Sequence, residues 1–286
     1  MWITLNRGTT GGSLGLEEFV KVAADAGFEG ADVDITWGVA HGAAALEDLY
    51  RRQRGGKLKY GAWGPSVDFR MEEPKYKEGL KNAEPQAKLA KQLGLDYAAT
   101  YLLPSSDMPF IQAWNWHVER LKPIARLMAD NGLRYGLEFV APWHHRRAKK
   151  HEFIFTPGLM LELADAIGPN VGLLVDSFHL YTAGTPWIEL AQIPKEKIVL
   201  CHLNDIADLP PEKVEDFKRL LPGEGVIDLH GYFDALSEAG FDGPIGLEVF
   251  SEELKQMSPA DAAKRAWKAT EKVWKPWKAK AAKQAK

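Results

Sequence analysis

The chain has 286 residues and one cysteine, with 45% hydrophobic and 26% charged residues and a formal net charge of −3. This composition is that of an ordinary globular protein with a sizeable core, and it excludes extensive disorder, an internal disulfide and a multi-cysteine zinc site. The length fits one α/β barrel of about 250 residues or two smaller domains.

Short β-rich runs alternate with longer amphipathic segments along the chain. Strands are predicted at residues 2–6, 30–35, 59–63, 97–102, 134–139, 171–176, 198–202 and 244–250. Helices are predicted at about 16–27, 43–54, 75–94, 109–131, 157–167, 186–191, 229–239 and 259–275. This alternation indicates a parallel sheet, and a single-domain (β/α)8 TIM barrel over residues 1–275 is the favoured arrangement, followed by a basic tail at 276–286. An open doubly wound sheet is the alternative, although no GxGxxG or GxxxxGK[ST] motif follows a strand.

Positive charge is concentrated near the C-terminal end. Residues 264–286 contain nine Lys or Arg residues and the single acid Glu271, so the rest of the chain has a net charge of about −11. An acidic body repels phosphate backbones, and nucleic acid is therefore not expected as a partner. The sequence contains no apolar run of membrane-spanning length and no signal-peptide pattern at residues 1–12. We therefore expect a cytoplasmic protein without a membrane partner, and the oligomeric state is left open.

The last four predicted strands each carry one acidic residue or histidine near their C-terminal ends. These residues are Glu138, Asp176, His202 and Glu248. Because side chains alternate along a strand, their hydrophobic neighbours should face the helices while these four point into the barrel mouth, the catalytic end of such barrels. Buried carboxylates need a compensating cation, so the set indicates one divalent metal ion. Three oxygen ligands and one nitrogen favour Mn²⁺, Mg²⁺ or Co²⁺, and Zn²⁺ is also compatible.

Five stretches around and after these residues carry a resemblance to a known family. They read GLEFV at 136–140, NVGLLVDSFH at 170–179, HLND at 202–205, RLLPGEGVID at 219–228 and GPIGLEVF at 243–250. Together they resemble the xylose isomerase-like barrel superfamily of sugar isomerases and epimerases, and most closely its inosose isomerase branch. The resemblance covers the second half of the chain, while the first half agrees only in its strand and helix rhythm.

The resemblance implies roles for particular residues. The four residues above would bind the metal, and Glu138 and Glu248 would also act as acid and base. His179, in the DSFH motif, would contact a substrate oxygen, and Arg219 would also bind substrate. Asp205 would orient His202 or a substrate hydroxyl. One departure from the pattern is Asp208, where ketose 3-epimerases of the superfamily commonly have an arginine, and it counts against a plain ketohexose epimerase.

Two further segments are candidates for the wall of the site. The loop WHHRRAKKH at 143–151 is more basic than its counterpart in smaller family members. Its His145 and Arg146 would recognise a carboxylate, a phosphate or the hydroxyls of a larger glycoside, and a solvated loop is the equal alternative. After the third strand, Trp63 and Arg70 are candidates for substrate contacts, although Trp63 also suits a place in the barrel filling.

These observations predict a metal-dependent isomerase or epimerase of a keto-sugar or keto-cyclitol, with a small-molecule substrate as its partner. The metal would chelate a carbonyl and its neighbouring hydroxyl, and the two glutamates would move a proton through an enediolate. Loss of a hydroxyl would instead make the protein a dehydratase or lyase of a keto-sugar or keto-glycoside. An apurinic endonuclease-like phosphodiesterase and a non-catalytic sugar-binding barrel are less favoured, since the former needs more metal-binding histidines.

Overall fold

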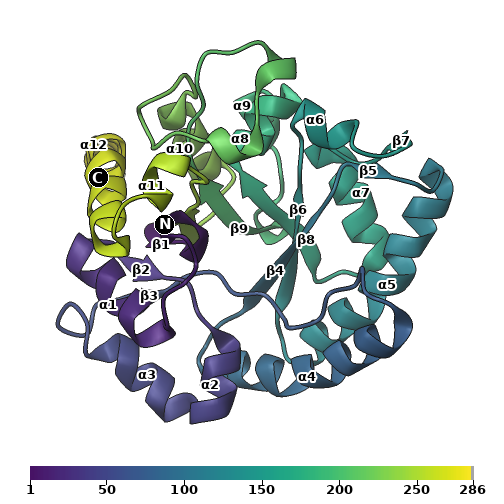
Figure 1. Cartoon of the computed structure of the whole chain (residues 1–286), viewed down its shortest axis with the longest axis horizontal. Coiled ribbons are helices and arrows are strands. Elements are labelled where there is room, and N and C mark those ends of the chain that lie inside the picture. Colours follow the sequence, from purple (N-terminus) through teal and green to yellow (C-terminus); the bar gives the residue numbers. More distant parts are fainter. Residues whose placement is uncertain (285–286) are drawn as a thin grey trace.

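Eight parallel strands occupy the centre of the molecule, and helices surround them (Figure 1). The computed structural model describes residues 1–284. The sheet order is β3-β2-β1-β10-β9-β8-β6-β4. The strands are β1 (Trp2–Leu5), β2 (Gly30–Ala31), β3 (Lys59–Tyr60), β4 (Tyr97–Leu102), β6 (Arg134–Phe139), β8 (Val171–Asp176), β9 (Ile198–Leu203) and β10 (Pro244–Leu247). The predicted single-domain TIM barrel is therefore confirmed.

The strands on one side of the barrel are shorter than predicted. β2 ends at Ala31, and the predicted continuation of this strand to residue 35 is wrong because helix α2 begins at Ile35. The side chain of Asp34 caps that helix by accepting the Trp37 N–H at 3.0 Å. A backbone hydrogen bond from Ala99 N–H to the Trp63 carbonyl, 3.1 Å long, links β4 to the segment that follows β3. This bond joins the two ends of the sheet.

Helices follow the strands in the order expected of a barrel. The longer ones are α1 (Leu16–Ala26), α2 (Ile35–His41), α3 (Ala43–Arg51), α4 (Glu73–Gln92), α5 (Phe110–Asp130), α7 (Pro157–Ile167), α8 (Ser177–Ala183), α9 (Trp187–Ala191), α10 (Leu229–Glu238) and α12 (Pro259–Gln284). Helices α2 and α8 were not predicted. α8 begins directly where β8 ends, because the side chain of Asp176 accepts the Phe178 N–H at 2.7 Å and caps the helix.

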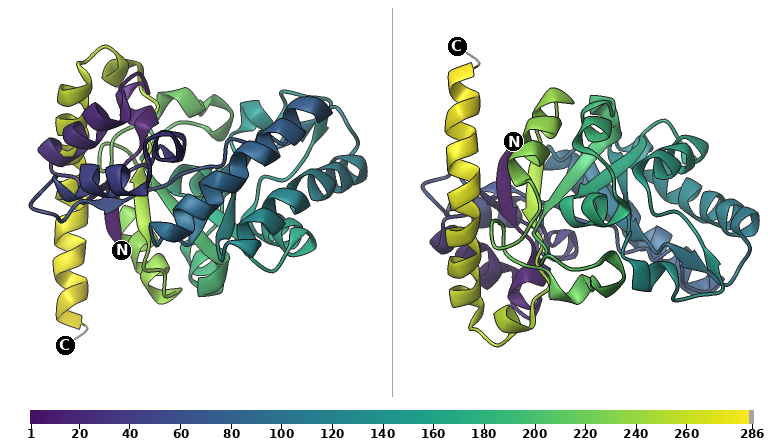
Figure 2. Two further views of the ribbon diagram at one scale, coloured as in Figure 1. Left: turned by 90° about the horizontal axis from the view of Figure 1, so that it is seen from below. Right: turned by 90° about the horizontal axis from the view of Figure 1, so that it is seen from above.

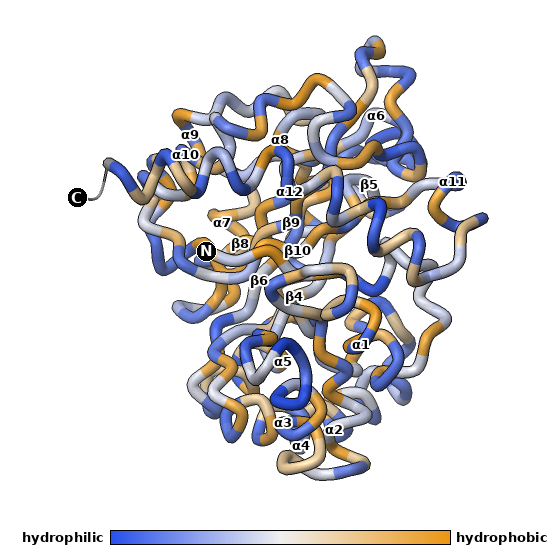
Figure 3. Tube along the Cα trace, turned by 90° about the vertical axis from the view of Figure 1, so that its left-hand side faces the viewer, coloured by the Kyte–Doolittle hydropathy of each residue, from blue (hydrophilic) through white to orange (hydrophobic). Residues whose placement is uncertain are grey.

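The two faces of the strands differ as their alternation predicts. Leu137, Val175 and Leu247 face the helices and are fully buried. Figure 3 shows hydrophobic residues along β8, β9 and β10 near the centre of the molecule. On the inner face, Gly246 leaves room for the ring of His202, since a Cβ at this position would lie 3.0 Å from His202 Cδ2. Small inner residues therefore leave space beneath the barrel mouth.

The last helix is longer than predicted and extends past the body of the barrel (Figure 2). α12 continues to Gln284, so it includes most of the predicted basic tail, whose residues 285 and 286 lie outside the described part of the chain. The helix continues past Pro276, and the next residue, Trp277, packs on Phe233 and donates to Asp234 at 2.6 Å. Within residues 1–284, no helix is both long and apolar enough to cross a lipid bilayer.

Additional structure lies on the loops after the strands. A small antiparallel sheet pairs β5 (Ser105–Ser106) with β7 (His151–Glu152), and α6 (Trp143–Arg146) lies between β6 and β7 in the chain. The loop between β9 and α10 contains the 3-10 turns η3 (Pro211–Lys213) and η4 (Asp216–Lys218). A short helix α11 (Glu252–Lys255) precedes α12. These loops surround the mouth of the barrel.

Candidate metal centre

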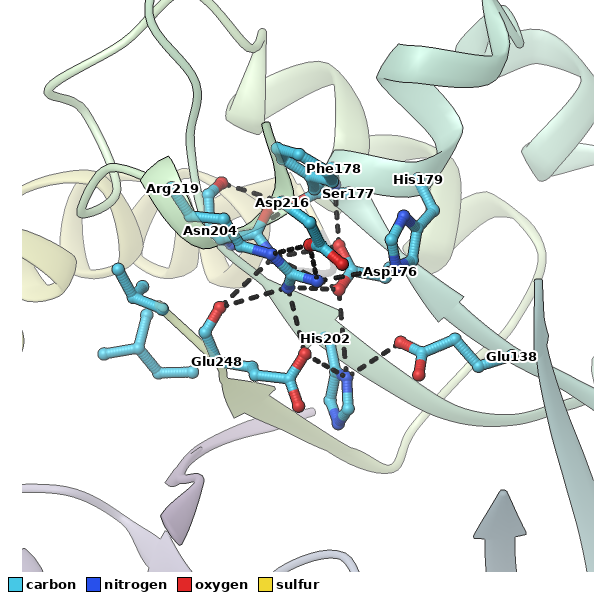
Figure 4. Close-up of polar contacts among 12 residues, drawn as sticks. Glu138, Asp176, Ser177, Phe178, His179, His202, Asn204, Asp216, Arg219 and Glu248 are labelled. Atoms are coloured by element: carbon cyan, nitrogen blue, oxygen red, sulfur yellow. Dashed lines mark hydrogen bonds and ion pairs between the residues drawn. The ribbon is translucent and has the colours of Figure 1, made fainter. Parts of the chain in front are cut away.

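Four side chains from neighbouring strands converge at the barrel mouth (Figure 4). Glu138 lies in β6, Asp176 ends β8 and His202 lies in β9. β10 ends at Leu247, one residue before Glu248, but the Glu248 N–H still donates to the Leu203 carbonyl at 3.1 Å, so the chain remains extended there. One potential ligand atom from each of the four residues lies within 4.8 Å of the others. The predicted ligands are therefore brought together.

The imidazole of His202 lies among the three carboxylates. Its Nδ1 atom is 3.1 Å from Glu138 Oε1, 3.4 Å from Glu248 Oε2 and 3.8 Å from Asp176 Oδ2. Two ligands of one ion held at about 2.1 Å can be at most about 4.2 Å apart, and all three of these distances lie below that limit. The oxygen and nitrogen donor set thus fits one divalent ion. Among residues 1–284, no second group of three or more such ligands converges.

The two glutamates differ in acidity. Burial raises the pKa of Glu138 to about 7, although the nearby His202 acts against this shift. Burial also acts to raise the pKa of Glu248, but His202 and Arg219 outweigh it and lower that pKa to about 2. Burial acts to lower the pKa of His202, and the carboxylates of Glu248 and Glu138 raise it well above its usual value. Glu138 therefore titrates near neutral pH, whereas Glu248 is ionised there.

Arg219 is the main cation beside these carboxylates. Its Nη1 atom lies 2.9 Å from Asp176 Oδ2 and 2.9 Å from Glu248 Oε2, while its Nε and Nη2 atoms lie 2.8 and 2.7 Å from Asp216 Oδ1. Burial acts to lower the pKa of Arg219, and the three acids raise it above its ordinary value. Asp216, which no sequence pattern indicated, therefore helps to fix the guanidinium against the two ligands.

The HLND motif contributes two residues with different roles. Asn204 donates to both oxygens of Asp176, at 2.9 and 3.2 Å, and so orients this ligand. Asp205 was expected to orient His202 or a substrate hydroxyl, and this expectation needs correction. Its carboxylate accepts backbone N–H groups of the following loop, namely those of Ile206, Gly223, Gly225 and Ile227 at 2.9–3.0 Å. Asp205 therefore organises the loop that carries Arg219.

Two cavities open beside the cluster and share Tyr101, Glu138 and Glu248. The first has a volume of about 330 Å³ and is also lined by Leu103, Val140, His145, His179, Asp216, Phe217, Arg219 and Phe250. The second, of about 290 Å³, lies beside β1, β2 and β3, and its further lining includes Asn6, Arg7, Asp32, Trp63, Thr100, Leu174 and His202. A cavity of about 450 Å³ at the opposite end of the strands, beside Trp2 and Pro244, contains none of these ligands.

The other predicted contact residues divide into two groups. His145, His179, Arg219 and Trp63 line the cavities beside the cluster. The Nε2 atom of His145 lies 3.3 Å from Asp216 Oδ2. Arg70 and Arg146 lie elsewhere, contrary to expectation. Arg70 stacks on Tyr101 and donates to its carbonyl at 3.0 Å, and Arg146 donates to the carbonyls of Ala141 and Thr182.

Polar residues in the first half of the chain also border the site and were not predicted. Asp32, directly after β2, is buried, and burial raises its pKa to about 7. Arg7, in the 3-10 turn η1 (Arg7–Thr10) that follows β1, lines the same cavity. The strand-end signal that identified Glu138 and Asp176 could not identify Asp32, because the predicted strand continued to residue 35 whereas β2 ends at Ala31.

Known proteins match this chain along most of its length. A family model described as a xylose isomerase-like TIM barrel matches residues 19–273. An inosose isomerase from Bacillus velezensis is 28% identical over 236 residues, which are 82% of this chain and 81% of that protein. A 3-dehydroshikimate dehydratase from Pseudomonas aeruginosa is 28% identical over 246 residues, which are 84% of this chain but 37% of that longer protein.

Solved structures agree with the fold. A xylose isomerase domain protein from Alicyclobacillus acidocaldarius superposes with a TM-score of 0.86 at 31% identity, covering 97% of this chain and 99% of that chain. The IolI protein, solved with a zinc atom bound, superposes with a TM-score of 0.78 at 24% identity over 97% of this chain and 99% of its own.

Proposed function

Because this chain belongs to the xylose isomerase-like TIM barrel family, we propose that it is a divalent-metal-dependent isomerase or epimerase of a keto-sugar or keto-cyclitol. The observation that carries the proposal is the placement of Glu138 and Glu248, whose carboxylates lie 3.1 and 3.4 Å from the same atom of His202 and line both cavities. The inosose isomerases among its relatives support a cyclic polyol ketone as the substrate class.

The cluster would hold the metal through Glu138, Asp176, His202 and Glu248. A bound divalent ion would supply electrostatic stabilisation of the negative charge that develops on a substrate oxygen when a neighbouring C–H proton is removed. The donor set of the cluster, three carboxylates and one imidazole, favours Mn²⁺, Mg²⁺ or Co²⁺ and is also compatible with Zn²⁺.

The residues of the chain then divide the proton transfers between them. One glutamate takes the proton from the carbon next to the carbonyl, and the other returns a proton to the neighbouring carbon or to the opposite face. Arg219 keeps Glu248 in place through the 2.9 Å contact. His179 lines the first cavity beside both glutamates, where it would bind a substrate oxygen.

A dehydratase or lyase is the second candidate, and His145 is the observation that favours it. This side chain lines the first cavity, and its Nε2 atom faces the buried carboxylate of Asp216 at 3.3 Å. A histidine held in this way can donate a proton to a departing hydroxyl after the glutamates have removed the C–H proton. Relatives named 3-dehydroshikimate dehydratase and inosose dehydratase support this chemistry.

An exchange experiment tests the proposal. The metal-loaded protein is incubated with a keto-inositol in deuterated buffer, and the ligand is followed by NMR. An isomerase or epimerase incorporates deuterium at the carbon next to the carbonyl without losing water. A dehydratase instead yields an unsaturated ketone, detected by its ultraviolet absorbance. If the protein converts the ketone with neither deuterium incorporation nor loss of water, neither glutamate has a proton-transfer role.

Two other classes of function are less well supported by the site. An apurinic endonuclease-like enzyme needs several metal ions, whereas one ligand cluster converges within residues 1–284. A non-catalytic sugar-binding barrel would bind the ketone without exchanging its protons, so the same NMR experiment identifies it. We propose a small sugar or cyclitol as the partner, and neither a nucleic acid nor a membrane.

A further inference from the structure

We propose that the cavity beside β1, β2 and β3 is a hydroxyl-binding subsite that receives the polyhydroxylated end of a neutral substrate, away from its reacting carbons. Asp32, Arg7 and Trp63 provide the contacts. This inference rests on the proposed function, because the cavity of about 290 Å³ also borders Glu138 and Glu248. It extends that function by stating what part of the substrate the first half of the chain selects.

Asp32 supplies a hydrogen-bond acceptor without a cation of its own. The residue is 7% exposed, and its carboxylate accepts only two backbone N–H groups, those of Ala62 at 3.0 Å and Arg7 at 3.4 Å, among the described residues. The guanidinium of Arg7 turns instead toward Asp34, 3.8 Å away, and the Leu14 carbonyl. A buried carboxylate with unused lone pairs is unfavourable unless another donor reaches it, and a substrate hydroxyl is such a donor.

Trp63 supplies a donor that also lacks a partner. Trp63 is 4% exposed, and its Nε1 atom is buried without a hydrogen-bond partner within residues 1–284. Nη1 of Arg7 is also buried without a hydrogen bond to a described residue, but it forms the ion pair with Asp34. Unsatisfied buried N–H groups are rare in proteins and call for an explanation. A hydroxyl both donates and accepts, so a cavity whose wall carries the acceptor Asp32 and the donor Trp63 matches a polyol.

The charge of the site selects a neutral ligand. Asp32, Glu138 and Glu248 line this cavity together with Arg7 and His202, so its acidic side chains outnumber its basic ones and disfavour a substrate carboxylate or phosphate. In the first cavity, Arg219 and Asp216 are bonded to each other and so offer fewer free groups to the remaining hydroxyls of the substrate. Its wall also includes Phe217, which is 56% exposed. The hydroxylated end of the substrate therefore points toward β1, β2 and β3.

The test compares two ketones and two conservative variants. 2-Keto-myo-inositol carries a hydroxyl on each ring carbon except the carbonyl carbon, whereas 2-hydroxycyclohexanone keeps only the carbonyl and one neighbouring hydroxyl. Dissociation constants are measured by calorimetry on the metal-loaded full chain, and KM and kcat are taken from the deuterium exchange assay. Asp32→Asn keeps the shape of the side chain, and Trp63→Phe removes the N–H while keeping an aromatic ring. Asp165→Asn, on an exposed part of α7, is the matched control.

We expect the wild type to bind the keto-inositol at least tenfold more tightly than 2-hydroxycyclohexanone. Each variant should weaken keto-inositol binding about tenfold and raise its KM more than it lowers kcat, with a much smaller effect on the simpler ketone. The control variant should leave the dissociation constants of both ketones unchanged. If the wild type neither binds nor exchanges either ketone, the proposed function itself fails. If it exchanges both with equal KM, or if the preference survives in both variants, the function stands and the subsite is overturned.

Discussion

The guanidinium of Arg219 lies between Asp176 and Glu248, with its Nη1 atom 2.9 Å from a carboxylate oxygen of each. The side chains of Arg219 and Asp176 are almost fully buried, and that of Glu248 is 12% exposed. Water therefore contributes little to their solvation, and the arginine supplies much of the compensation for two of the four ligands. The stability of the fold and the affinity for the metal are therefore coupled through this residue.

Replacing this arginine tests the coupling. Arg219→Met leaves three buried or nearly buried carboxylates without their common partner, so it should lower the free energy of unfolding of the metal-free protein by about 3–5 kcal/mol. A saturating divalent ion should then stabilise the variant more than the wild type, because it restores part of the missing positive charge. Urea denaturation with and without metal measures both effects. Arg52→Met, at an exposed position, is the control, and equal unfolding free energies for all three proteins would contradict the coupling.

The cluster predicts one tightly bound divalent ion per chain. Elemental analysis after gentle purification should find a stoichiometry near one, since the four ligands provide a single coordination sphere. Asp176→Asn removes one ligand charge and should lose most of the metal while the far-ultraviolet circular dichroism stays native. Two or more ions retained per wild-type chain would instead favour a multi-metal hydrolase.

Metal affinity should rise with pH around neutrality. Burial raises the pKa of Glu138 to about 7, and its carboxylate neighbours raise that of His202 well above its usual value, so at pH 7 in the metal-free protein His202 is protonated and Glu138 is partly protonated. Both must lose these protons to act as ligands, and binding at pH 7 should therefore release protons. Calorimetric titrations in two buffers of different ionisation enthalpy detect the release. Identical heats in both buffers would show that the ligands are already deprotonated.

The glutamates can be tested separately from the metal. Glu248→Gln keeps the shape of the side chain and one oxygen ligand but cannot accept a proton, so solvent-deuterium exchange into a bound ketone should fall by about 100-fold or more. Glu138→Gln should impair the other proton transfer. Ligand binding, followed by calorimetry at saturating metal, should persist in both variants. Undiminished exchange in either variant would remove that glutamate from the mechanism.

His117 should make the fold sensitive to mild acid. Burial lowers the pKa of this histidine to about 4, against 6.5 for its ordinary value, so the unfolded chain binds a proton that the folded protein rejects. Stability from this group is complete above about pH 6.5 and is lost as pH falls toward 4, by about 1.4 kcal/mol per pH unit. His117→Phe preserves aromatic packing on Phe153. Between pH 7 and pH 5, the free energy of unfolding of this variant, measured by urea titration, should therefore fall by about 2 kcal/mol less than that of the wild type. Parallel losses would rule out His117 as the cause.

Local sequence patterns were sufficient to predict the barrel and the convergence of four ligand-type side chains at its mouth. β6 and β8 combine hydrophobic alternation with a polar residue near or at the end, and this combination is enough to place Glu138 and Asp176 on the inner face. α2 and α8 were missed because each begins at or just after a strand end, where Asp34 and Asp176 cap the helix with their side chains. A pattern of hydrophobic residues does not reveal such a cap.

Roles that depend on loop conformation could not be predicted. Asp216 and Arg219 are separated from the strands by a long irregular loop, and only its folded path brings them against Asp176. Asp205 stands in a family motif, yet its partners are backbone N–H groups whose directions the sequence does not specify. Arg70 and Arg146 carry the charge expected of substrate-binding residues, but nearby carbonyl groups occupy their donors.

The candidate metal ligands all lie between residues 138 and 248, whereas Asn6, Arg7, Asp32 and Trp63 belong to the first 63 residues of the chain. With the roles proposed above, reactivity and substrate choice are encoded in separate stretches of the gene. Recombination between homologous genes at the loop before β4 could exchange one without disturbing the other, and point mutations in β1, β2 or β3 could alter substrate preference while the metal was retained. A barrel divided in this way offers evolution, and protein engineering, a route to new substrates that begins from an intact catalytic half.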